Sequence, residues 1–383
     1  MTPRLLVQRL FVLFLVVATA SLVSFKTASA FETEAKAAIL VDMETGQTLF
    51  EKNADYPLPP ASMSKLMTTY MVLELIKDGR LKMDDTLPVS KKAWKKGGSK
   101  MFVEVGKRVR TDDLLRGIII LSGNDACIVV AEGLSGSEEQ FAKDMTVKGR
   151  EIGLTNSKFA NASGWPAPDH LMTARDLATL AIRLIEDFPE QYHIFAERDF
   201  EYSEIRQPNR NLLLGRVPGA DGLKTGHTDE AGYGLVASAI RDSRRLVSVA
   251  MGLGSAQARA TENERLLEFG FRRFRNYPLL TKGQEIDHAN VWLGKELTVP
   301  LVVDRDIMVT LTDQARREMQ IKLIYDTPIP APIRQGSEVA KVIVEAPGLT
   351  MEEFPVLAGA DVPKADLIGR VTGALEYLIF GPS

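Results

Sequence analysis

The sequence of 383 residues contains a single cysteine, Cys127, and only four histidines. One cysteine cannot form a disulfide within the chain, and the apolar stretch around Cys127 predicts a buried thiol rather than a nucleophile. None of the histidines has a second potential ligand at a metal-binding spacing such as H-E-x-x-H. We therefore expect no metal and no cofactor.

Charge of one sign is also scarce, since the formal net charge is only −3. Without a strong basic field, a zinc-finger spacing or a basic helix, the sequence does not suggest a nucleic-acid partner. Hydrophobic residues make up 45% and charged residues 25%, which is typical of a soluble globular protein, and the length suits two or three domains.

Residues 1–30 have the pattern of a secretory signal peptide. Arg4 and Arg9 precede an apolar run over residues 10–23, and an A-x-A cleavage pattern ends at Ala30. A retained membrane anchor is the alternative, but the run is short for a span of roughly 20 residues. We expect cleavage after Ala30 and export of the remaining chain.

Hydrophobic periodicity predicts an α+β fold for residues 31–277. Two short apolar runs around a glycine-containing turn indicate a hairpin over 37–51, and recurrence at three and four residues indicates a helix over 62–77. A mainly helical region follows to about 188, strands resume from 219 to 253, and another helix covers 262–274. We expect one antiparallel sheet that carries both N- and C-terminal strands, with helices packed around it.

The composition changes near Tyr277, and residues 278–363 alternate between strand-like runs and turns rich in proline and glycine. This pattern predicts a small all-β domain. Residues 364–383 form a possible amphipathic helix, because Leu367, Val371, Leu375 and Leu378 recur on one face.

Three short elements could carry chemistry. The first is S-x-x-K over residues 62–65, in which helical spacing places Lys65 within reach of Ser62. A serine hydroxyl needs a base to act as a nucleophile, and burial with nearby positive charge can lower the pKa of a lysine enough to serve. Taken alone, Ser62 is better explained as an ordinary helix N-cap.

The second and third elements are S-G-N over residues 122–124 and K-T-G over residues 224–226. The first lies in a gap between two helical stretches, where Ser122 and Asn124 would be exposed. The second is expected at the start of a strand, where Lys224 supplies charge, Thr225 a hydroxyl, and Gly226 room for a substrate backbone. Taken alone, S-G-N could be an ordinary turn between two helices, and K-T-G could be the exposed start of a surface strand.

In this order and spacing, the three elements resemble the superfamily of active-site serine acyl enzymes, which comprises β-lactamases and penicillin-binding proteins. The S-G-N variant, together with residues 60–68, 122–127 and 224–233, is similar to the low-molecular-mass D-Ala-D-Ala carboxypeptidases. The resemblance covers about 37–274 and continues more loosely through the β-domain. It implies a β-lactamase/transpeptidase-like domain followed by a small β-domain.

The resemblance implies an acyl-enzyme mechanism on peptidoglycan stem peptides. Lys65 would take the proton from Ser62, which would attack the carbonyl between the last two D-alanines. Backbone N–H groups of Ser62 and His227 would stabilise the oxyanion. Ser122 would relay a proton to the departing D-alanine, and Asn124 would hold the substrate amide and Lys65. A β-lactam would acylate the same serine and stall there.

At the carboxylate end of the substrate, the resemblance assigns Lys224 and Thr225 to the terminal carboxylate. Arg259 stands where the family places an arginine near that group, and Arg210 has a similar position relative to Lys224. Each arginine could equally be a surface charge. His227 is expected to act through its backbone rather than as a catalytic acid.

Three alternatives are weaker. Residues 160–167 lack the glutamate with which class A β-lactamases deacylate, and the long β-domain also argues against a β-lactamase. Endopeptidases that cut crosslinks share the three elements but commonly lack the second domain. A cell-wall binding protein without activity would not need Ser62, Lys65, Ser122 and Lys224.

The resemblance also implies a periplasmic enzyme on the outer face of the inner membrane, because related carboxypeptidases end in a helix that lies in the membrane surface. From Ala365 onward, the tail lacks lysines and contains Asp366 and Glu376. A helix packed on its own protein is therefore the alternative.

Overall fold

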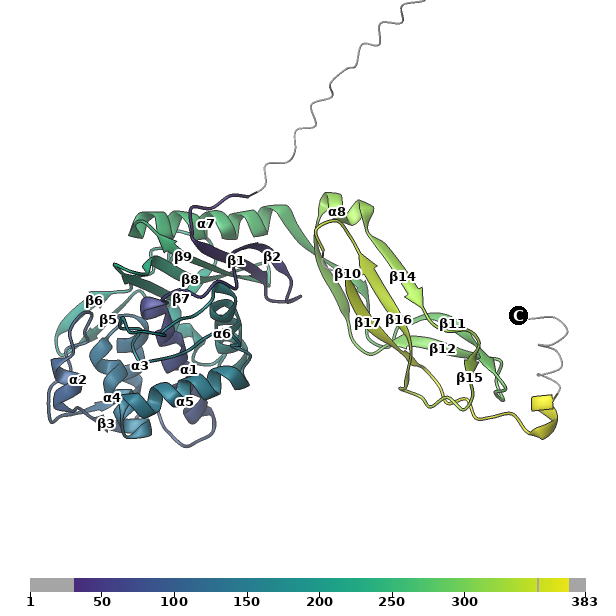
Figure 1. The fold of residues 1–383 in the computed structure, drawn as a ribbon, viewed down its shortest axis with the longest axis horizontal. Helices are drawn as coiled ribbons and strands as arrows, with labels where there is room; N and C mark the ends of the chain where they lie inside the picture. The colour runs from purple at the N-terminus through teal and green to yellow at the C-terminus, as the bar shows by residue number, and fades with distance from the viewer. Residues whose placement is uncertain (1–30, 350, 372–383) are drawn as a thin grey trace, which may run out of the picture. The chain divides into compact units, whose positions relative to one another are not determined.

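The computed structural model describes residues 31–349 and 351–371 (Figure 1). Its first part is built on a five-stranded antiparallel sheet in the order β2-β1-β9-β8-β7. Strands from the two ends of this part are paired directly, since Ile39 of β1 lies opposite Val249 of β9. The expected sheet is confirmed. The strands are β1 (Ala37–Asp42), β2 (Thr48–Lys52), β7 (Ala220–Thr228), β8 (Gly232–Arg241) and β9 (Arg244–Leu253).

Helices cover both faces of this sheet (Figure 1). Helix α7 (Ala256–Arg273) packs on one face, whereas α6 (Ala174–Asp187) packs on the other and also contacts α1 (Lys65–Lys77). The remaining helical elements are η1 (Ala61–Ser64), α2 (Lys91–Lys95), α3 (Thr111–Ile119), α4 (Asn124–Ser135), α5 (Glu138–Glu151) and η2 (Tyr192–Ala196).

Side-chain caps explain where several helices begin. Thr173 is the N-cap of α6, because its hydroxyl accepts a hydrogen bond from the backbone N–H of Asp176 at 3.0 Å. Ser137 and Ser255 cap α5 and α7 in the same way. These caps satisfy backbone donors that a helix cannot satisfy internally.

Two small two-stranded sheets were not expected from the sequence. They pair β3 (Thr86–Pro88) with β4 (Arg108–Arg110), and β5 (Asp199–Tyr202) with β6 (Ile205–Pro208). Strands of three or four residues are too short for a period of two to stand out from chance.

The chain from Phe274 onward is almost entirely β-structure, with a six-stranded sheet in the order β14-β16-β17-β12-β11-β15 and a separate β10–β13 pair. Alternating residues of these strands form an apolar core that includes Leu301, Val342, Val344 and Val356. The elements are β10 (Phe274–Leu280), β11 (Glu285–Trp292), β12 (Thr298–Val303), β13 (Ile307–Thr312), α8 (Asp313–Glu318), β14 (Gln320–Ile324), β15 (Ile329–Pro330), β16 (Glu338–Glu345) and β17 (Glu352–Ala358).

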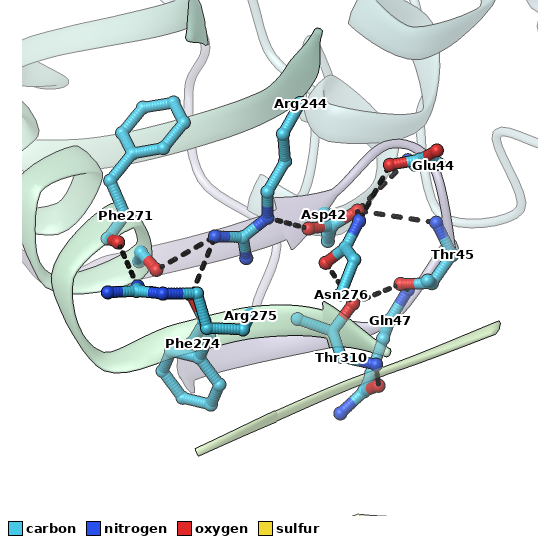
Figure 2. Close-up of polar contacts among 11 residues, drawn as sticks. Asp42, Glu44, Thr45, Gln47, Arg244, Phe271, Phe274, Arg275, Asn276 and Thr310 are labelled. Carbon is cyan, nitrogen blue, oxygen red and sulfur yellow. Dashed lines mark hydrogen bonds and ion pairs between the residues drawn. The ribbon is translucent and has the colours of Figure 1, made fainter. Parts of the chain in front are cut away.

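A polar cluster links the β1–β2 hairpin to the start of β10 and to β13 (Figure 2). The buried Asp42 carboxylate accepts from Arg244 Nε at 2.7 Å, and Arg244 also donates to the carbonyl of Phe274, where α7 gives way to β10. Asn276 donates to Asp42 at 3.4 Å, and the Thr310 hydroxyl lies 2.7 Å from that of Thr45.

The predicted signal peptide (1–30) lies outside the described residues, as does most of the predicted tail helix (364–383). A helical turn occupies 367–371, where Leu367, Ile368 and Val371 are largely exposed. Across residues 31–349 and 351–371, we find no helix with the length and apolarity that a membrane span requires.

Candidate active site

Ser62 and Lys65 meet at the junction of η1 and α1. Side chains three residues apart eclipse one another in a 3₁₀ turn, and η1 is such a turn. Lys65 Nζ lies 2.8 Å from Ser62 Oγ, so the contact expected from the S-x-x-K spacing is present. Ala61 reaches this turn with a φ of +48°, a left-handed conformation that non-glycine residues seldom adopt outside functional sites and tight turns.

Lys65 is completely buried and its amine is surrounded by acceptors. Besides Ser62, Nζ donates to Asn124 Oδ1 at 2.8 Å and, through a short hydrogen bond, to the carbonyl of Ser163. Burial, together with the positive charges of Arg210 and Lys96, lowers the pKa of Lys65 to about 8. The three acceptors match the three donors of an ammonium, so loss of one proton would leave a lone pair for the serine hydroxyl.

The S-G-N element lies between α3 and α4, as the sequence predicted. Ser122 has a φ of +61° and is 2% exposed, so the turn is strained and the serine is buried rather than exposed as expected. Asn124 begins α4 and its Nδ2 donates to the carbonyl of Gly97 at 2.9 Å. Its amide is thereby oriented with the oxygen toward Lys65.

The K-T-G element lies inside β7, so its expected place at the entry of a strand was wrong. Residues 222–226 are all buried against η1 and neighbouring strands. Burial, followed by repulsion from Lys65 and Arg210, holds the pKa of Lys224 well below its usual range. The buried amines of Lys65 and Lys224 therefore repel one another when both are protonated.

Gly226 allows β7 to pack directly against the nucleophile turn. A Cβ on Gly226 would lie 2.8 Å from the Pro60 carbonyl oxygen and 3.1 Å from Met63 Cγ. Glycine was predicted here for the approach of a substrate backbone. The close approach in the structure is instead to the protein's own backbone before Ser62.

Arg259 is buried in α7 and lies beside the K-T-G strand. Its Nη1 donates to the Gly226 carbonyl at 3.4 Å, and its guanidinium stands 5.7 Å from the Tyr233 ring centroid. Burial lowers its pKa to about 10. The imidazole of His227 is exposed and stacks on Tyr233 at 3.8 Å, so its side chain does not join the Ser62–Lys65 contact.

Arg210 comes from the segment that connects β6 to β7. Its Nη1 donates to Ser99 Oγ at 2.5 Å, and its charge acts on both Lys65 and Lys224. Burial also lowers the pKa of Arg210. Direct contacts thus join Ser62, Lys65 and Asn124, and join Arg259 to Gly226; Thr225 is buried within the same strand as Lys224.

Cys127 is buried as predicted, and burial raises the pKa of its thiol to about 12. A thiol of that pKa is almost entirely protonated near neutral pH and is a poor nucleophile. This agrees with the assignment of Ser62, rather than Cys127, to nucleophilic chemistry.

The sequence did not reveal the carbonyls of Ser163 and Gly97, which hold Lys65 and Asn124. Every residue carries a carbonyl, so residue type gives no signal for such a role. Asp125 was also missed: its carboxylate accepts the N–H groups of residues 101–103 and fixes that segment beside the site. Its position directly after S-G-N was the available signal.

Two family models match the chain. One, described as D-alanyl-D-alanine carboxypeptidase, matches residues 24–255. This chain belongs to the D-alanyl-D-alanine carboxypeptidase family. The second model, described as the C-terminal domain of penicillin-binding protein 5, matches residues 274–364 of this family member.

Among related proteins, D-alanyl-D-alanine carboxypeptidase DacC of Escherichia coli K12 is 37% identical over 354 residues, covering 90% of this chain and 88% of that protein. The crystal structure of penicillin-binding protein 5 from Haemophilus influenzae has a TM-score of 0.80 at 34% identity and covers 88% and 99% of the two chains. Penicillin-binding protein D2 of Listeria monocytogenes, solved in an ampicillin-bound form, has a TM-score of 0.59 at 31% identity, covering 63% and 99%.

These matches confirm the predicted family and fold class: a mixed helix–strand, transpeptidase-like domain followed by an all-β domain. They span both parts of the chain. A resemblance first found in three short elements therefore extends through nearly the whole described structure.

Proposed function

We propose that this family member is a serine D-Ala-D-Ala carboxypeptidase that removes the terminal D-alanine from peptidoglycan stem pentapeptides. The observation that carries the proposal is the 2.8 Å contact between Ser62 Oγ and a buried Lys65 amine whose pKa is about 8. Such an amine is partly unprotonated near neutral pH, which a general base requires.

In the proposed reaction, neutral Lys65 takes the hydroxyl proton as Ser62 Oγ attacks the carbonyl of the penultimate D-alanine. The backbone N–H groups of Ser62 and His227 stabilise the oxyanion. When the tetrahedral intermediate collapses, the C–N bond breaks and Ser122 relays the proton to the departing amine. Water then hydrolyses the ester between Ser62 and the shortened peptide. Asn124 holds the substrate amide and keeps Lys65 in place.

The substrate carboxylate is proposed to lie near Lys224, Thr225, Arg259 and Arg210. Burial and repulsion from Arg210 lower the pKa values of both Lys224 and Arg259. A group of cations held this way would be stabilised by an incoming anion. A terminal carboxylate supplies one, and the carboxylate of a β-lactam would serve equally in covalent inhibition.

The domain limits follow as part of the proposal: a signal peptide over 1–30, the acyl-enzyme domain over 31–277, the β-domain over 278–363 and a tail over 364–383. Export would place the enzyme in the periplasm. Exposed Leu367 and Ile368 at the start of the tail support peripheral contact with the outer face of the inner membrane.

The decisive test is D-alanine release from a stem pentapeptide by wild type and Ser62→Ala, alongside labelling with a fluorescent β-lactam. We expect release and labelling by wild type and neither by the variant. Labelling of Ser62 without D-alanine release would keep the acyl-enzyme chemistry and exclude the carboxypeptidase. Release by Ser62→Ala at the wild-type rate would exclude Ser62 as the nucleophile.

A further inference from the structure

The loop over residues 158–171 provides one of the three acceptors around the Lys65 amine. Lys158 and Leu171 close the loop by exchanging backbone hydrogen bonds of 2.9 and 3.1 Å. At its tip, the Ser163 carbonyl accepts the short hydrogen bond from Lys65 Nζ. The position of this loop therefore bears directly on where the proposed base points.

The tip of the loop is packed tightly against the nucleophile turn. A Cβ on Gly164, whose φ is +74°, would clash with the carbonyl oxygen of Ala61. The neighbouring Ala162 carbonyl accepts from Thr68 Oγ1 of α1 at 2.6 Å. With so little space, a shift of the loop would move the Ser163 carbonyl relative to Lys65.

Two side chains within the loop hold its tip in shape. The Asn161 carboxamide oxygen accepts from the N–H groups of Ser163 at 3.1 Å and of Trp165 at 3.0 Å. One residue earlier, the N–H of Ala160 donates to Nδ1 of His170 at 3.3 Å. His170, near the end of the loop, thus holds Ala160, near the start of the loop, in place.

His170 is suited to this task because it is buried and stays uncharged. It is 3% exposed, and its ring meets that of Phe159 edge-on with centroids 5.8 Å apart. Acceptance at Nδ1 requires an unprotonated Nδ1, hence the tautomer with its proton on Nε2. Burial, aided by the charge of Lys65, lowers the pKa of His170 to about 4, so this tautomer persists at the pH where the amine works.

We propose that His170 is a positioning residue for the general base: its Nδ1 anchors the loop that holds the Ser163 carbonyl against Lys65. This inference rests on the proposed function. In the described part of the chain, His170 forms no hydrogen bond or ion pair with Ser62 or Lys65, so it acts through the loop.

Charged groups of both signs lie around His170, and of these the positive charge of Lys65 lowers its pKa. Lys65 lies on the α1 side, Glu138 of α5 accepts from the N–H of Ala162, and Glu230 borders the same cavity of about 10 Å³ as His170. The adjacent Asp169 is paired with Lys158 at the surface. No step of the proposed role requires His170 to change charge above pH 5.

The test compares His170→Leu, which removes the acceptor, with His170→Asn, whose Oδ1 can occupy the place of Nδ1. For each full-length variant, kcat and KM for pentapeptide hydrolysis and the rate of acylation by penicillin are measured from pH 6 to 10, per folded enzyme. We expect His170→Leu to lower kcat and the acylation plateau about 10- to 100-fold, the range that a small misplacement of a catalytic group can cost. KM should stay within about twofold, since no residue of the proposed carboxylate site lies in this loop.

His170→Asn should recover most of the lost rate, and Lys158→Met, a surface change in the same loop, should match wild type. A purely structural His170 would instead lower the melting temperature of both variants and leave the plateau unchanged; that result overturns the inference. If His170→Leu does not fold, Asn161→Ala releases the same tip from its other anchor and must lower the plateau. Failure of wild type itself to be acylated would overturn the proposed function and this inference with it, whereas a normally acylated wild type with an unchanged plateau in His170→Leu would overturn this inference alone.

Discussion

The part of the chain before Phe274 buries charged side chains in addition to an apolar core, whereas the part after it buries almost only apolar side chains. The first encloses Lys65, Lys224 and Arg259 together with several uncharged polar groups, whereas Thr310 is the single fully buried polar side chain among the described residues from Phe274 onward. Burying charge is costly unless it is paired or its pKa shifts. In the first part, burial of Lys65 costs stability but keeps its amine partly unprotonated, as the proposed chemistry needs. The second part buries almost no polar side chain, and its apolar core contributes only stability.

The largest expected effect comes from removing the buried amine. Lys65→Met should lower acylation by at least about 10³-fold, because Ser62 loses its base. Stability should change far less. The fall in pKa from 10.5 to about 8 corresponds to roughly 3 kcal/mol of burial cost that methionine lacks. Acceptors left unpaired at Asn124 and Ser163 cost about 1–3 kcal/mol each, so the two effects largely cancel.

Penicillin acylation and urea denaturation of the same samples test this. The matched control is Lys77→Met, an exposed lysine of the same helix, which should leave both quantities near wild type. A large loss of stability in Lys65→Met, comparable with deleting a core side chain, would mean that the buried amine contributes to folding. The claim that the first part buries its charged amine at the expense of stability would then be wrong.

The next effect concerns the polar cluster between them (Figure 2). Asp42→Asn removes the carboxylate from a pair whose arginine side chain is only 12% exposed, which leaves the Arg244 charge uncompensated. We expect a loss of about 3–5 kcal/mol in the free energy of unfolding, as for other broken buried pairs. Thr310→Val, which deletes a hydroxyl but no charge, should cost only about 1 kcal/mol. Equal losses in the two variants would show that charge burial does not dominate this cluster.

A smaller loss is expected in the apolar core of the second part. Leu301→Ala at a fully buried position should lower the free energy of unfolding by about 2–5 kcal/mol through lost burial and a cavity. Acylation by penicillin should remain at the wild-type rate, because no residue of the proposed site lies beyond Arg259. Leu297→Ala, at an 81% exposed position nearby, is the control and should change neither quantity. A fall in the acylation rate of folded Leu301→Ala would link this core to the chemistry.

Within the first part, features that depend on local geometry could be predicted from the sequence, and features that depend on packing could not. Apolar runs predicted the central sheet, and helical spacing predicted the contact of Ser62 with Lys65, because both depend on local geometry. The burial of Ser122 and the place of Lys224 inside β7 depend on how distant segments pack. The carbonyl of Ser163, brought to Lys65 across 98 residues, has no signature of its own.

The last prediction uses pH to isolate the buried amine. Acylation should rise about tenfold per pH unit below 8 and level off above it, since neutral Lys65 is the reactive form. Stability should follow the same group. Below pH 8 both folded and unfolded states hold the proton, and the burial cost is fully present. Between about 8 and 10.5 the unfolded state binds more protons, so the free energy of unfolding rises with pH.

Lys224, whose pKa is also lowered by burial, adds to this rise. Lys341 in the second part has the opposite tendency, because pairing with Glu353 raises its pKa. Its contribution is present below the unfolded pKa and disappears only as pH rises through the higher folded value, so it stays nearly constant up to pH 9.5. Urea denaturation at pH 7 and 9.5 should therefore show a rise that shrinks in Lys65→Met and persists in Lys341→Met. If the rise persists unchanged in Lys65→Met, its source is not the buried amine beside Ser62, and the assignment of Lys65 as the general base loses its electrostatic support.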